Sequence, residues 1–192
     1  MADMVSELMS AAGSGNNLSL ISNAVGGNTN QVQSALGMGL PLIMGSMANT
    51  AAKPGGADML AGMLRTAGAS SPLDNMAGFL DNPAAAGGSA MVSTLFGSQI
   101  GAVQNAISQK TGLPPAIVGK VLEIAAPMVM GYVGKMFLKQ NMDSAGLSSL
   151  LAGQSAAALG SSPDAAALAQ QLMGGQAGAA GATGMMKKLF GR

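Results

Sequence analysis

The chain has 192 residues and a net charge of +1, and only 9% of its residues are charged. This length allows one domain or two small ones with a real core, and a surface with so few charges tends to associate. The nine lysines and arginines are thinly spread, and Lys187-Lys188 is their one adjacent pair. We therefore expect no nucleic-acid partner, because that function needs a clustered basic face.

The sequence contains neither cysteine nor histidine. This composition excludes disulfides and thiolate metal sites, and it removes the most common general base and metal ligand. The carboxylates, the lysines and the single tyrosine form no catalytic motif, so we expect a non-enzymatic protein that uses no cofactor. Asp3 and Glu7 are interpreted as a solvated helix face, and Glu123 as the ion-pair partner of Lys120.

The N-terminal segment, residues 1–7, carries acids where a secretory signal would carry lysine or arginine. We expect a cytoplasmic protein by default, with export by a route that needs no such signal as the alternative. Residues 35–52 and the later apolar segment around Glu123 are only marginally apolar or carry a charge. They are therefore interpreted as buried core helices in preference to membrane spans.

Apolar periodicity and helix-capping residues predict an all-α fold. The first expected helices span residues 4–12 and 18–25, a long helix around 32–47, and then 58–66 and 72–80. The later ones span 89–96 continuing toward 110, with a helix at 103–110, a long helix around 118–133, and then 144–152 and 163–173. Expected caps are Asn28 or Thr29, Gly26, Gly112, and the serines of the two Ser-Pro pairs, Ser71 and Ser162. No segment alternates with the period of a strand, so we expect no sheet.

The second set of helices repeats the first. Residues 21–47 and 107–133 align without gaps, share eight identities and are offset by 86 residues. Two tandem, internally duplicated units are predicted at 1–82 and 88–173, packed together as a single domain. Pro41 and Pro127 fall at matching points inside the two long helices, and we expect each to kink its helix there.

The repeated apolar stripe gives the expected core. Its members are Val32, Leu36, Leu40, Ile43 and Met47 in the first unit, and Val118, Leu122, Ala126, Val129 and Val133 in the second. Glycines near the two prolines, at positions 37, 39, 45, 131 and 134, predict close helix crossings. The 17 methionines are interpreted as core filler between these small residues.

Several of these motifs together resemble a known family. Leu95–Gly97, Thr111–Leu113 and the run from Ile117 through Leu122 to Met130 are similar to the YidB-like bacterial proteins, catalogued as domain of unknown function 937. Residues 25–41 resemble the opening of that family, and the resemblance covers most of residues 1–155. It implies an all-α fold and a bacterial source, and it brings no accepted reaction and no functional residues.

The C-terminal residues 174–192 form a separate segment. A Gly/Ala-rich stretch at 174–184 is typical of a flexible linker, and Met185–Gly191 follows it. This last run is similar to Met91–Gly97 and is interpreted as the first helix of an incomplete third unit; the alternative is a disordered cationic end. Its apolar side chains are the expected self-association residues: Met185, Met186, Leu189 and Phe190.

Low charge, duplicated units and a leftover unit fragment favour a self-assembling structural protein, a homo-oligomer or filament whose partner is itself. Two alternatives stay open at this point. One is a membrane-associated helical protein, and the other is a monomeric adaptor that binds a partner helix in a Met-lined groove.

Overall fold

The structure, a computed structural model, describes residues 4–13, 16–69, 71–81 and 87–170, apart from the side chain of Val5. These residues are almost entirely helical and include no strand, which confirms the all-α prediction. The first half contains α1 (Met4–Gly13), α2 (Asn17–Val25), α3 (Thr29–Ala51), α4 (Gly56–Ala69), the 3-10 turn η1 (Pro72–Asp74) and α5 (Met76–Asp81). The second half contains α6 (Gly88–Phe96), the 3-10 turn η3 (Gly97–Gln99), α7 (Ile100–Thr111), α8 (Pro115–Lys139) and α9 (Ser144–Ser161), and residues 163–170 are also helical.

The ends of the helices lie where the capping residues place them. The Asn28 side-chain oxygen accepts a hydrogen bond from the backbone N–H of Asn30 at 3.0 Å and caps α3. Gly26 (φ 76°) and Gly112 (φ 73°) end α2 and α7 in the left-handed conformation, which glycine adopts without steric cost. Pro115 begins α8, where its missing N–H removes no helical bond.

Three predicted helix boundaries are wrong. The expected helix at 72–80 is broken into η1 and α5, because the Asn75 side chain accepts the N–H of Gly78 and starts a new helix there. The expected cap at Ser71 is not made, and its hydroxyl is buried without a partner. The turn η3, which begins at Gly97 (φ 53°), separates α6 from α7. α9 continues to Ser161, because no proline follows Ala152 before residue 163.

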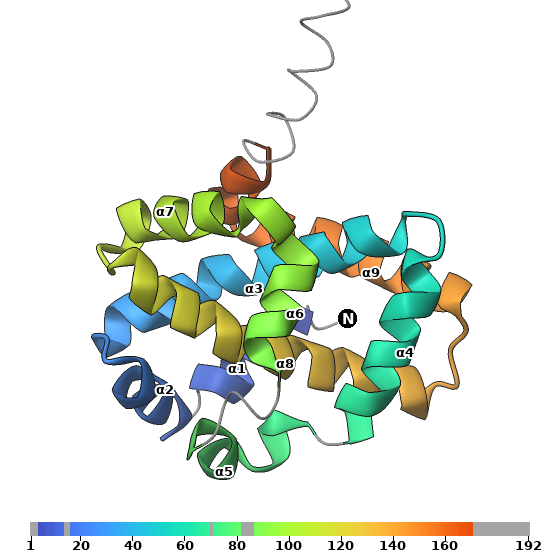
Figure 1. Ribbon diagram of the computed structural model, residues 1–192, viewed down its shortest axis with the longest axis horizontal. Helices are drawn as coiled ribbons and strands as arrows, with labels where there is room; N and C mark the ends of the chain where they lie inside the picture. Colours follow the sequence, from blue (N-terminus) through green and yellow to red (C-terminus); the bar gives the residue numbers. More distant parts are fainter. Residues whose placement is uncertain (1–3, 14–15, 70, 82–86, 171–192) are drawn as a thin grey trace, which may run out of the picture.

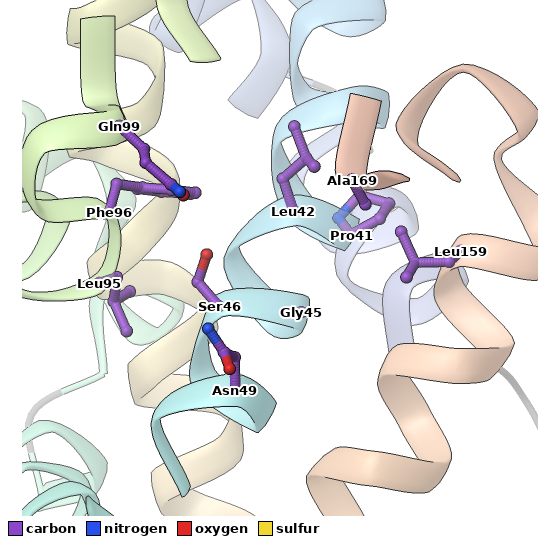
Figure 2. Close-up of a pocket in the computed structure, with 10 residues that line it drawn as sticks. All are labelled: Pro41, Leu42, Gly45, Ser46, Asn49, Leu95, Phe96, Gln99, Leu159 and Ala169. Atoms are coloured by element: carbon purple, nitrogen blue, oxygen red, sulfur yellow. The ribbon is translucent and has the colours of Figure 1, made fainter. Parts of the chain in front are cut away.

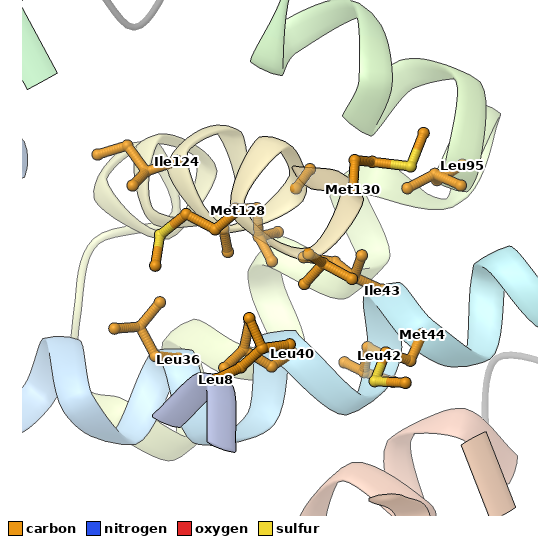
Figure 3. Packing of buried hydrophobic residues seen from close by; sticks show 14 of the residues in the cluster. Leu8, Leu36, Leu40, Leu42, Ile43, Met44, Leu95, Ile124, Met128 and Met130 are labelled. Carbon is orange, nitrogen blue, oxygen red and sulfur yellow. The ribbon is translucent and has the colours of Figure 1, made fainter. Parts of the chain in front are cut away.

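The long helices α3 and α8 run across the middle of the molecule, and the other helices lie around them (Figure 1). Figure 3 shows their apolar side chains facing one another, with Leu36, Leu40 and Ile43 of α3 opposite Met128 and Met130 of α8. All ten residues of the predicted stripe are at most 1% exposed. The predicted core is therefore confirmed on both helices.

The two halves of the chain pack by exchange of helices. α4 packs chiefly on α8, in the other half, and α9 packs chiefly on α3. At the first crossing the backbones touch: a Cβ atom on Gly134 would lie 2.4 Å from the Leu64 carbonyl oxygen, and one on Gly68 would lie 2.5 Å from the Gly134 carbonyl carbon. This crossing confirms the predicted close approach at Gly134, and it means that neither half forms a closed unit by itself in the structure.

Candidate functional site

A pocket opens beside Pro41 on α3, and its walls come from segments far apart in the sequence (Figure 2). Its lining residues are Pro41, Leu42, Gly45, Ser46 and Asn49 of α3, Leu95 and Phe96 of α6, Gln99 of η3, Leu159 of α9, and Ala169. The cavity among them is small, about 60 Å³, and is partly open to solvent. We call this space the Pro41 pocket.

The Pro41 pocket is apolar, with three uncharged polar side chains. Figure 2 shows the Ser46 hydroxyl and the Gln99 amide directed into the space between α3 and α6. None of the ten lining residues has an acidic or basic side chain, so the pocket itself contains no group for general acid–base catalysis. An apolar hollow with a few hydrogen-bonding groups is suited to bind an apolar side chain or ligand.

Pro41 also explains a contact that the sequence analysis missed. A proline has no N–H, so the carbonyl of Gly37, four residues earlier, has no helical partner. The Ser162 hydroxyl donates to this carbonyl at 3.5 Å and so connects the segment after α9 to α3. The sequence analysis interpreted Ser162 only as a helix cap. The signal that points to the contact is the unpaired carbonyl that an internal proline requires.

Pro127 has a corresponding effect in α8, where it leaves the Glu123 carbonyl without a helical partner. The backbone of Gly88 lies so close to this oxygen that a Cβ on Gly88 would be 2.0 Å from it. The expected ion pair between Glu123 and Lys120 is wrong. Glu123 is half-buried where α6 begins and packs on α8, Lys120 is exposed, and the ion pairs among the described residues are Lys110–Asp164 and Lys135–Asp74.

The one perturbed ionisable group among the described residues is Tyr132 of α8. Its hydroxyl donates a hydrogen bond to the Glu7 carboxylate of α1 at 2.5 Å. Partial burial, followed by this hydrogen bond and the negative charge of Glu7, raises the pKa of Tyr132 to about 12. The hydrogen bond between Tyr132 and Glu7 joins α1 to α8.

The described residues contain no group of three or more acidic side chains that could hold a metal ion. α8 is long and apolar enough to cross a membrane by length and composition alone, but 72% of its most apolar window is buried inside the protein. The buried helix of a soluble core meets the same criterion, so this feature is weak evidence for a membrane span.

The structure places the residues singled out by the sequence in different surroundings. Both prolines are buried in their helices, and Pro41 also lines the pocket. The expected self-association residues Met185, Met186, Leu189 and Phe190 lie outside the described residues. Gln99, Leu159 and Ala169 of the pocket had no sequence signal, because only the tertiary fold brings them to Pro41.

Comparison with protein families identifies the chain. Residues 7–136 match the family model described as bacterial protein of unknown function (DUF937), so the chain belongs to this family. Comparison with curated proteins and with solved structures finds no similar chain. The family assignment agrees with the resemblance in the sequence, and it brings no reaction, ligand or functional residue.

Proposed function

We propose that this member of the DUF937 family is a non-enzymatic structural protein that assembles with copies of itself into an oligomer or a filament. The observation that carries the proposal is the exchange of helices between the halves, α4 onto α8 and α9 onto α3. Each long helix thus buries its apolar face under a helix from another unit. Repeat units that complete one another in this way can extend the same contact to the next chain.

The same exchange supports an internal duplication of units 1–82 and 88–173. In each unit the third helix carries an internal proline, and the helix that follows it crosses the long helix of the other unit. We propose that Pro41 and Pro127 bend the two helices in the same way, since each removes one helical hydrogen bond at the matching position. Superposition of residues 21–47 on 107–133 in an experimental structure tests this point.

The C-terminal residues 174–192 supply a second element of the proposal. The apolar run Met185–Phe190 is similar to Met91–Phe96, two residues of which, Leu95 and Phe96, line the Pro41 pocket. A flexible linker of about ten residues spans roughly 15–20 Å, which is enough to reach a neighbouring chain. We propose that Met185, Met186, Leu189 and Phe190 bind to another copy and strengthen the assembly.

The assembly state can be measured over a range of protein concentrations by size exclusion with light scattering. Electron microscopy of the same samples shows the form of any assembly. Deletion of residues 180–192 should lower the assembly state and leave the helical content almost unchanged. Replacement of Met185, Met186, Leu189 and Phe190 by serine should have the same effect, while the control with Lys187 and Lys188 changed to glutamine should assemble like the parent. A monomer at every concentration would contradict self-assembly.

The Pro41 pocket gives specific support to one alternative function, a monomeric adaptor that binds an apolar partner segment. Its apolar lining and the hydrogen-bonding groups of Ser46, Asn49 and Gln99 suit such a ligand. Two results together would favour the adaptor function: the parent protein stays monomeric, and Ser46→Leu abolishes its binding of a partner segment. The membrane-associated alternative has weaker support, because α8 is mostly buried; liposome flotation tests it.

A further inference from the structure

The helix α9 and residues 163–170 form an arm that lies chiefly against α3, with further contacts to α4 and α1 and an ion pair to α7. The arm buries Leu147, Leu151, Ala158, Ala165 and Leu168. Its polar contacts to other helices are the Gln154 side-chain oxygen that accepts the Met4 N–H of α1 at 3.2 Å, the Ser162 hydroxyl that donates to the Gly37 carbonyl of α3, the Ser144 hydroxyl that donates to the Asp58 carboxylate of α4, and the ion pair between Asp164 and Lys110 of α7 at 2.8 Å. We refer to residues 144–170 as the α9 arm.

The α9 arm is joined to α8 by a short turn, residues 140–143, and it packs chiefly on α3. In this turn the N–H of Asn141 bonds to the Leu138 carbonyl, and the N–H of Met142 bonds to the Phe137 carbonyl. Asn141 has a φ of 46° and is the only residue other than glycine with a positive φ in the described part of the chain. The conformation that ends α8 therefore carries a steric cost that glycine would not have.

The corresponding turn between α3 and α4 is built differently. Gly55 takes the positive φ there, at 73°, and a Cβ on Gly56 would lie 1.9 Å from the Thr50 carbonyl oxygen. Two glycines thus allow a tight turn without side-chain strain. Of the two turns that lead into the exchanged helices, the one before α9 is the turn whose opening would relieve strain.

The contact of the α9 arm with α3 also lacks the backbone contact that holds α4 on α8. Gly68 of α4 and Gly134 of α8 bring two backbones into contact, whereas a Cβ on any of the α3 glycines (Gly37, Gly39, Gly45) would meet no atom of α9 within 4 Å. Separation of α9 from α3 breaks side-chain packing and a few polar contacts, and it requires no pair of backbones to be pulled apart.

We propose that the α9 arm exchanges between copies of this chain, so that the arm of one copy lies on α3 and α4 of another and its Asp164 pairs with Lys110 there. Every contact of the arm is then made again between chains, and a turn that straightens into continuous helix through residues 140–143 relieves the positive φ of Asn141. Reciprocal exchange gives a two-fold dimer, and onward exchange gives a filament. This inference rests on the proposed self-assembly and specifies the surface that mediates it.

The exchange can be tested with a mixture of unlabelled and heavy-nitrogen-labelled chains that is unfolded and refolded together. Carbodiimide, which joins a lysine directly to a carboxylate, then crosslinks the ion pairs of the refolded protein. The pair Lys110–Asp164 joins α7 to the arm, so in the assembled fraction its crosslinked peptides should include products that mix the two labels. The pair Lys135–Asp74 joins α8 to η1, both before the turn, and is the control that should give products of single label only.

Two outcomes overturn different parts of the argument. An assembled fraction in which Lys110–Asp164 crosslinks are always of single label would overturn the exchange and leave self-assembly standing. Protein that is monomeric throughout would overturn the proposed function and the exchange together.

Substitutions in the turn give a second test. Asn141→Gly removes the steric cost and should lower the assembled fraction, while Asn141→Ala should raise the association constant roughly tenfold, since a left-handed alanine costs about 1–2 kcal/mol. Gly55→Asn is the matched control, because it places asparagine at the corresponding positive φ of the α3–α4 turn. It should not increase mixed-label crosslinks. An assembly unaffected by both Asn141 variants would contradict the inference.

Discussion

The two helix crossings, α4 on α8 and α9 on α3, have the same arrangement and different tightness. At α4–α8 the glycines Gly68 and Gly134 allow backbone contact, and the ion pair Lys135–Asp74 and Arg65, 5.8 Å above the Phe137 ring, lie at the same crossing. The proposed repeat aligns Gly134 with Ala48 and Gly68 with Ser155. The difference teaches that the same kind of helix pairing can form with glycines in backbone contact at one crossing and with larger side chains at the corresponding positions of the other.

The largest expected effect is in the core, where substitutions test whether α3 and α8 differ in packing as their crossings with α9 and α4 do. Leu36 of α3 and Leu122 of α8 are at most 1% exposed, and truncation of either to alanine should lower the free energy of unfolding by about 2–5 kcal/mol. Chemical denaturation measures both. Leu138→Ala, at a position 42% exposed on α8, is the control and should change stability by less than about 0.5 kcal/mol.

Similar losses of stability at Leu36 and Leu122 would mean that the two long helices are equally well packed in the core, and that the difference lies only where α4 and α9 cross them. A much smaller loss at Leu36 would mean that the α3 side is loosely packed throughout, and a loss under half a kcal/mol at both would contradict their place in the core.

The next effect tests the backbone contact at the α4–α8 crossing. A Cβ on Gly134 would meet three backbone atoms of α4 at 2.4–2.8 Å, so Gly134→Ala should destabilise the protein by about 1–3 kcal/mol. Gly153 on α9 has open space, and Gly153→Ala should stabilise it by about 0.5–1 kcal/mol through helix propensity. Thermal and chemical unfolding should show effects of opposite sign. Gly153 is exposed, so its variant is the control for helix propensity, and a Gly134→Ala protein as stable as the parent would contradict the backbone contact at α4–α8.

Much of the fold could be predicted because its signals are local. The apolar period identified every member of the buried stripe, and Asn28, Gly26 and Gly112 mark helix ends through groups within a few residues. Periodicity indicates which face of a helix is buried, and it does not indicate which helix covers that face. The exchange of α4 and α9 depends on contacts between distant segments, so it could not be read from either unit alone.

The candidate site shows the same limit. The sequence identified Pro41, but the pocket exists because α6 and the α9 arm approach it, and neither has a motif for that approach. Glu123 was wrongly paired with Lys120 because helical spacing places them on one surface. The approach of Gly88 to the Glu123 carbonyl, where α6 packs on α8, is a tertiary effect that this spacing does not contain.

The smallest expected effect concerns a contact of α8 that α3 does not have. Tyr132 bonds to Glu7, whereas the position that the repeat aligns with it on α3 is Ser46, in the Pro41 pocket. The chain has one tyrosine and no tryptophan, so tyrosinate absorbance reports Tyr132 alone. The native protein should titrate near pH 12, and the protein unfolded in urea near the ordinary pKa of 10.0. Glu7→Gln should lower the native pKa toward 10.0, while Asp81→Asn, on α5, should not change it.

Because the folded pKa lies above the unfolded one, the unfolded state loses this proton first as the pH rises. The contribution to stability is complete below about pH 10 and is lost as the pH rises from 10.0 to about 12. Since solvent screens a partly exposed pair, the loss should be on the order of 1 kcal/mol. Urea denaturation at a series of pH values measures it, and Tyr132→Phe should flatten this part of the profile. A native titration near pH 10 would mean that α1 is not held on α8 by this bond, and α8 would then resemble α3 in this respect.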